Sequence, residues 1–276
     1  MTSLQQSIEL HQAPKLKVLP LIGAALARFV RRTAAIGALL LFWELAPRLG
    51  LVEPAFVPPL SEVLTTGVQL LRDGQLQSHI EASVMRSLTG FFIAIGYAVP
   101  LGLAIGWSKR VAETINPLLE VLRNTAALAL LPVFLLIFGI GETSKIALVI
   151  YACSWPILLN TISGVRTVDP LLIKSARTMG LGSYDLLRKV VLPASLPTVF
   201  AGVRLAGAYS LLVLVAAEMV GAKAGLGYLI IYSQYNFQIP HMYVGIITIT
   251  VLGLLFTSVL QRLERRFTSW KPTQSE

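Results

Sequence analysis

Apolar runs about twenty residues long recur along this chain, and they limit its possible folds more than any other feature. Hydrophobic residues make up 55% of the 276 residues and charged residues only 13%, whereas a typical globular domain has about 25% charged residues. A soluble fold cannot cover its surface with so few charges. Disorder is excluded for the same reason, and the single cysteine, Cys153, excludes a disulfide scaffold. With roughly 20 residues per span, five to seven transmembrane helices fit into the chain.

Six segments have the length and composition of membrane spans, which predicts an all-α polytopic membrane protein. We expect the spans at about 34–51, 78–107, 117–140, 146–164, 198–219 and 243–263. The first is interpreted as a retained helix, because the leader before it is long for a signal peptide and no A-x-A pattern follows. In the second, Gly102 and Gly106 form a G-x-x-x-G pair. This pair indicates either a close helix–helix contact or the ordinary glycine content of membrane helices.

The stretch between the first two spans, residues 53–83, is more polar and is expected at the outer surface of the membrane. Ser61 is the expected cap of a short helix whose apolar spacing suits a position on the membrane surface. Ser78 and Glu81 form a capping box, which predicts the start of the second span. A polar break is expected at 108–116, before the third span.

The basic residues are distributed unevenly between the two sides of the six predicted spans. Sixteen Lys and Arg residues fall in the N-terminal segment, in the loops after the second and fourth spans and in the tail, and five fall on the other side. The positive-inside rule therefore places both termini in the cytoplasm. The bilayer explains the net charge of +9 without a nucleic acid partner. We expect a cytoplasmic segment at 1–33, a permease domain at 34–266 with a cytoplasmic loop at 165–197, and a tail at 267–276.

The cytoplasmic loop at 165–197 predicts two short helices outside the membrane. Asp169, followed by proline, is a typical helix start, and Gly180 is the expected stop. Ser183 is expected to cap the second helix. Leu192-Pro193 is expected to end it, since proline disfavours helix at the residue before it.

Three apolar residues of this loop, Leu171, Leu172 and Met179, would face water if the two short helices had no partner. Either another protein or lipid headgroups must then cover them. The loop is therefore interpreted as a docking element, with an interfacial helix as the alternative.

Residues 174–180 and 190–193 resemble the EAA loop of ABC-transporter permeases, whose form is E-A-A, three residues, G, nine residues and I-x-L-P. The spacing from Gly180 to Pro193 fits, whereas Lys174 and Ser175 stand where the family usually has Glu and Ala. Further segments are similar to the taurine, aliphatic-sulfonate and nitrate branch of these permeases, namely 58–64, 138–142, 160–170 and 217–228.

The resemblance implies a type I importer permease that forms a homodimer of six-helix subunits in the inner membrane of a bacterium. Each subunit would dock one of two cytoplasmic ATPases, and a substrate-binding protein would deliver a small anion at the outer face. The chain itself has no phosphate-binding loop and no catalytic motif, so ATP and Mg would be used by the partner ATPase and no cofactor is expected here. The expected docking residues are Asp169, Leu171, Leu172, Lys174, Ser175, Ala176, Arg177, Met179, Gly180, Ser183, Leu192 and Pro193.

Polar residues within membrane spans are candidates for lining the pathway. They are Glu120, Arg123, Asn124, Asn160, Ser163, Arg204 and Glu218. Glu120 and Arg123 either pair on one helix face or leave a positive lining that attracts an anion. Arg204 is expected to snorkel to cytoplasmic headgroups. Glu218 is either a functional acid, which contacts the delivery protein or caps a gate, or an interfacial acid held by the glycine-containing loop that follows it.

Two other classes of function remain open at this stage. A transporter or channel driven by an ion gradient would have paired acids at mid-membrane and an internal repeat, and neither is evident in the sequence. A membrane enzyme would need a catalytic constellation near an interface. The three histidines are scattered, and Cys153 is expected to fill the core.

Overall fold

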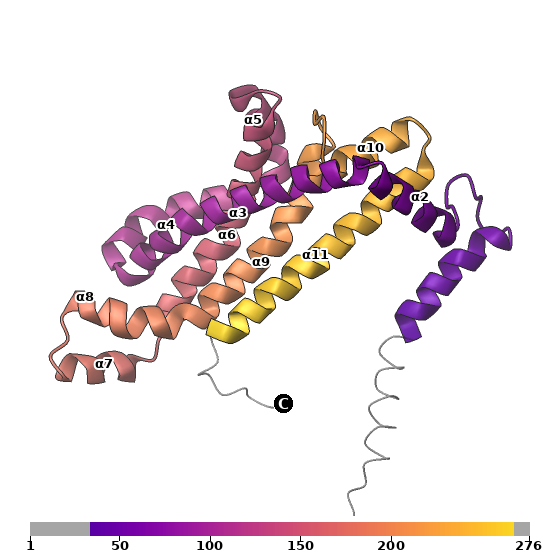
Figure 1. Ribbon diagram of the computed structural model, residues 1–276. Helices are drawn as coiled ribbons and strands as arrows, with labels where there is room; N and C mark the ends of the chain where they lie inside the picture. Colours follow the sequence, from indigo (N-terminus) through magenta and orange to yellow (C-terminus); the bar gives the residue numbers. More distant parts are fainter. Residues whose placement is uncertain (1–33, 268–276) are drawn as a thin grey trace, which may run out of the picture. The chain divides into compact units, whose positions relative to one another are not determined.

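The computed structural model describes residues 34–267, and this part of the chain is α-helical apart from its turns (Figure 1). The predicted all-α class is therefore confirmed. The expected cytoplasmic segment at 1–33 and the tail after residue 267 lie outside the described residues. Within the described residues, the boundary between two compact units falls after Ser61.

In the first unit, residues 34–48 are helical, and the carboxylate of Glu44 holds the chain that follows. It accepts hydrogen bonds of 2.9 Å from both the backbone N–H and the hydroxyl of Ser61, and it pairs with Arg48 at 2.5 Å. Because its hydroxyl donates to Glu44, Ser61 does not cap the next helix as predicted. Helix α2 (Leu60–Arg72) begins one residue earlier.

In the second unit, four helical runs are long and apolar enough to cross a membrane. They are α3 (Gln75–Trp107), α6 (Glu142–Arg166), the continuous run α8, η2 and α9 (Ser183–Glu218), and α11 (Ile239–Phe267). A fifth span is present if the bent pair of α4 (Lys109–Arg123) with η1 (Ala127–Leu130) and α5 (Leu131–Phe138) is counted as one. The pair bends by 83°. Four or five of the six predicted spans are thus present among the described residues.

Helix α6 lies between α3 and α9, with α11 on the other side of α9 (Figure 1). Glycines allow α3 and α6 to approach closely, because a Cβ added at Gly102 or Gly106 would lie 2.7 Å from a side-chain carbon of Thr161 or Val165. Of the two interpretations of the G-x-x-x-G pair, the structure matches the close helix–helix contact. Cys153 is fully buried in the core between these helices, as expected.

Two predicted helix starts were wrong. Helix α3 begins at Gln75 instead of Ser78, because Gly74 adopts a left-handed conformation (φ 72°) that reverses the chain directly before it. The Ser78 hydroxyl donates to the carbonyl of Gln75 instead of capping. The predicted polar break at 108–116 is the first half of α4, because the Ser108 side chain accepts from the N–H of Val111 and caps that helix.

The fourth span also begins earlier than the expected residue 146, since α6 already starts at Glu142 and the left-handed turn before it lies at Gly139 (φ 77°). Pro193 does not end a helix either. Here α8 (Ser183–Leu186), the π-helical turn η2 (Leu187–Val191) and α9 (Leu192–Glu218) are continuous. The wider π turn directly before the proline accommodates a residue without an N–H, so the helix continues.

Candidate functional site

The loop between α6 and α9 forms a short helix outside the spanning helices, α7 (Pro170–Thr178). A carboxylate oxygen of Asp169 accepts a 2.8 Å hydrogen bond from the N–H of Leu171, which is the predicted N-cap. Gly180 follows α7 with φ 82°, a left-handed conformation that L-residues rarely adopt. The predicted limits of this helix are therefore confirmed to within one residue.

Helix α7 has one buried and one exposed face. Ala176 is buried, and Ile173 packs against a small apolar core of Val165, Val168 and Val191. The opposite face exposes Leu171 by 67% and Met179 by 77%. An exposed apolar face on a segment outside the spans needs a cover, as the sequence predicted.

The remaining predicted docking residues lie around this face. Leu172, Lys174, Ser175 and Arg177 are exposed on α7, and Lys174 has no ion pair within residues 34–267. Ser183 is exposed at the start of α8, but Gly182 is the cap there and the Ser183 side chain makes no capping bond. Leu192 and Pro193 form the first turn of α9, as part of the continuous helix.

The base of the loop packs on the end of α3. Val165, Val168 and Val191 form a small core to which Leu103 and Trp107 of α3 contribute. A force applied to α7 would therefore be transmitted to α3 as well as to α6 and α9.

At the opposite end of α6, a group of charged side chains joins three of the spanning helices. We call Ser83, Arg86, Glu142 and Glu218 the Arg86 cluster. Arg86 of α3 pairs bidentately with Glu142 of α6, with one N–H···O distance of 2.7 Å, and its Nη1 is 2.6 Å from the carboxylate of Glu218 at the end of α9. The side chain of Glu218 has no solvent exposure and that of Arg86 only 5%. Two helices are thus held to α3 by one guanidinium.

The loop after α9 completes the hydrogen bonds of Glu218. Its carboxylate accepts from the hydroxyl of Ser83 at 2.8 Å and from the N–H of Gly227 at 2.9 Å. Gly225 has φ 122°, and an added Cβ there would collide with the same carboxylate. Of the two interpretations of Glu218, the structure matches an acid held by the glycine-containing loop.

This cluster was missed from the sequence, because Arg86, although within the second predicted span, was considered only as one of the five basic residues on the outer side of the spans. An arginine within an apolar helix needs an acidic partner, and that signal was available at Arg86. Lys145 was counted in the same way, but it is buried and donates to the carbonyl of Gly141 at 2.9 Å.

The candidate pathway residues do not form one site. Glu120 and Arg123 lie on one exposed face of α4 with 3.7 Å between their charged atoms. Asn124 caps α4 and donates to the carbonyl of Glu120. Arg204 pairs with Glu264 of α11 at 2.9 Å, because the two helices pack side by side.

The two candidates on α6 differ from each other. Asn160 faces α9, where a Cβ at Gly202 would touch it, and its amide donates to the carbonyl of Pro156. Ser163 is exposed. A pathway role for any of these residues stays a prediction.

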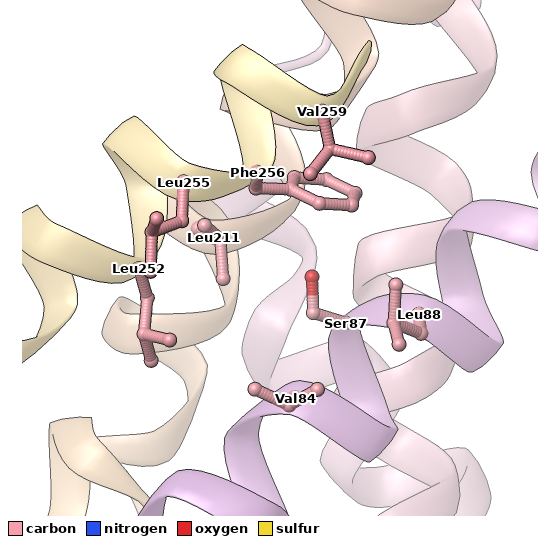
Figure 2. Close-up of a pocket in the computed structure, with 8 residues that line it drawn as sticks. All are labelled: Val84, Ser87, Leu88, Leu211, Leu252, Leu255, Phe256 and Val259. Carbon is pink, nitrogen blue, oxygen red and sulfur yellow. The ribbon is translucent and has the colours of Figure 1, made fainter. Parts of the chain in front are cut away.

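A pocket of about 220 Å³ lies between α3, α9 and α11 (Figure 2). Its walls are leucine, valine and phenylalanine side chains, and Ser87 is the polar residue that points into it. The Ser87 hydroxyl is already hydrogen-bonded to that of Ser210 at 3.0 Å. Such a pocket suits an apolar chain and offers no charged group to an ionic solute.

No metal site is evident in the described part of the chain, where no three His, Cys, Asp or Glu side chains gather suitably. His79 accepts a hydrogen bond from the N–H of Gly225 and so belongs to the surroundings of the Arg86 cluster.

Comparisons with known proteins agree with this architecture. SsuC of Bacillus subtilis (strain 168), a permease protein named for aliphatic sulfonates transport, is 34% identical over 229 residues, which are 83% of either chain. TauC of Escherichia coli (strain K12), a taurine transport system permease protein, is 33% identical over 85% of this chain and 87% of TauC. The fold is similar to that of a chain of the MetNI methionine ABC transporter in an inward-facing conformation. The TM-score is 0.64 at 19% identity, over 70% of this chain and 96% of that one.

Residues 98–269 match the model of one protein family, and they include the loop between α6 and α9 as well as α9 and α11. That match covers more than half of the chain, and the relatives cover most of it. The chain therefore belongs to the family of binding-protein-dependent transport system inner membrane components.

Proposed function

We propose that this chain forms half of the membrane passage of an importer for a small anion, such as a sulfonate, taurine or nitrate. Its family makes it a permease subunit of an ABC importer. The anionic solute is supported by the names of the relatives SsuC and TauC. In this proposal two copies of the chain assemble in the inner membrane of a bacterium, with both termini in the cytoplasm.

In the same proposal, two separate ATPase subunits bind and hydrolyse ATP with Mg, and this chain contributes no catalytic group. A substrate-binding protein delivers the solute on the other side. The observation that carries the proposal is the exposed apolar face of α7, around Leu171 and Met179. It lies on a rigid helix whose base is packed on the ends of the spans, so a bound ATPase could move them.

The test is to purify the tagged chain with the ATPase encoded beside its gene and to measure ATP-driven uptake into vesicles with the binding protein. Gly180→Trp should abolish both co-purification and uptake, because a bulky L-residue cannot hold the left-handed conformation that ends α7.

The matched control is Gly182→Ala, two residues further on, where φ is −68° and an added Cβ would meet no neighbour. That variant should retain the ATPase and its uptake activity. If Gly180→Trp kept the ATPase bound as well as the control does, the assignment of α7 as the docking helix would be wrong.

A further inference from the structure

A second pocket, of about 270 Å³, lies between α4 and α6 and differs in chemistry from the apolar pocket in Figure 2. Four of its lining residues come from α4 and three from α6. They are Asn116, Leu119, Glu120 and Arg123, and Leu159, Ile162 and Arg166. We call it the arginine pocket. Its volume is near the lower end of the range for small-molecule sites, about 300–1,000 Å³, so it suits a small solute.

The charges in the arginine pocket are not balanced. Glu120 is 3.7 Å from Arg123, a loose contact between two exposed groups. Arg166, the last residue of α6, has no ion pair within the described residues 34–267. Two guanidinium groups therefore face one carboxylate, and the amide of Asn116 adds a hydrogen-bond donor. The pocket carries an excess positive charge.

The position of the pocket argues against a face turned to lipid. Helix α6 has the properties of a membrane span, and Arg123, Glu120 and Asn116 are exposed alongside it. Charged side chains directed at hydrocarbon are costly, and they usually face a water-filled cavity or a partner. This face is therefore the part of the unit best suited to border an aqueous passage.

We propose that the arginine pocket binds the sulfonate group of the transported solute, so that the permease itself selects for charge. The inference deepens the proposed function and rests on it. Arginine presents donors in a fork that matches a tetrahedral oxyanion, with two N–H groups able to bind two oxygens at once. Arg166 lies four residues before Pro170, so an occupied pocket is adjacent to the start of α7.

A direct test uses trifluoromethanesulfonate, a singly charged sulfonate with a fluorine NMR signal. It is titrated into the purified full-length chain in phosphatidylcholine nanodiscs, and taurine is added as a competitor. The wild-type chain should broaden the signal and taurine should reverse this. Arg166→Gln should weaken binding about tenfold or more, the typical effect of losing a hydrogen bond to a charged group. Arg123→Gln should act in the same direction.

The control is Lys109→Gln, which removes one positive charge from the same helix but outside the pocket. The Lys109 side chain is 91% exposed and 3.8 Å from Glu113. The Lys109→Gln variant should bind the sulfonate as tightly as the wild type. Equal affinity of wild type and Arg166→Gln, or no binding by the wild type, would overturn the proposal.

The phosphate of a lipid headgroup is an oxyanion that arginine binds in the same way as a sulfonate. A second experiment therefore distinguishes a bound lipid from a bound solute. Nanodiscs with phosphatidylglycerol are analysed by native mass spectrometry. Retained phosphatidylglycerol that is lost in Arg166→Gln, without sulfonate binding, would assign the pocket to lipid and refute the solute. Uptake measured with the ATPase and the binding protein tests the proposed function separately from the pocket. Uptake without sulfonate binding to the isolated chain refutes the pocket alone. Sulfonate binding without uptake refutes the proposed function alone.

Discussion

The Arg86 cluster and helix α7 lie at opposite ends of α6, and they handle polar and apolar groups in opposite ways. In the cluster, the charged groups of Arg86 and Glu218 are buried and paired, with Glu218 accepting from Ser83, Arg86 and Gly227. On α7, apolar groups are exposed and uncovered. A buried, satisfied cluster fixes the helices of one chain relative to each other, whereas an exposed apolar face is free to bind another chain. The comparison predicts that stability and coupling to a partner can be separated by mutation.

The largest effect is expected from Arg86→Leu. The substitution leaves the fully buried carboxylate of Glu218 without its cation, and breaking such a pair costs about 3–5 kcal/mol. Thermal unfolding of the purified chain in detergent should show a large drop in Tm. The control Arg110→Leu removes an exposed arginine of α4 and should change Tm little. Similar Tm values for the two variants would mean that the cluster does not hold the helices together.

A smaller loss is expected from Gly225→Ala. At φ 122° an alanine is strained, and its Cβ would collide with the carboxylate of Glu218. Strain of this kind costs about 1–3 kcal/mol, so the drop in Tm should be smaller than that of Arg86→Leu. Gly96→Ala in α3, where an added Cβ would meet no neighbour, serves as the comparison. A Gly225→Ala variant as stable as Gly96→Ala would contradict the geometry of this loop.

The smallest effect on stability is expected from the double variant Leu171→Asp and Met179→Asp. Both side chains are exposed in the isolated chain, so unfolding should change by no more than about 0.5 kcal/mol. Association with the ATPase should nevertheless be lost, because the two carboxylates would be buried without partners in the interface. Co-purification together with a Tm measurement tests both parts. A large drop in Tm with the ATPase still bound would mean that these α7 side chains stabilise the fold and do not bind the partner.

The features that could be predicted from the sequence depend on local patterns. The apolar runs identify the all-α class, the Asp169-Pro170 pair identifies the start of α7, and Gly180 identifies its end. Each of these depends on residues within one or two helical turns, where the physical causes are hydrogen bonding of the helix end and the φ angle of one residue.

The misplaced boundaries have different causes, and one of these causes lies far away in the chain. Ser61 was expected to cap a helix, but its hydroxyl is engaged by Glu44, 17 residues earlier. Pro193 was expected to end a helix, yet the preceding π turn allows the helix to continue to Glu218. In both cases the local preference was real, but another hydrogen-bonding arrangement was available and was more favourable in the folded chain.

By itself, the sequence determined that this chain is a helical membrane protein with a short helical loop between two of its spans, because hydropathy and helix ends are properties of short segments. Only the tertiary structure decided that Arg86, Glu142 and Glu218 are partners, since 132 residues separate the first from the last. It also brought Arg123 next to Arg166 in one pocket. Charges distant in the chain have no spacing rule, and only the packing of α3, α4, α6 and α9 determines which of them meet.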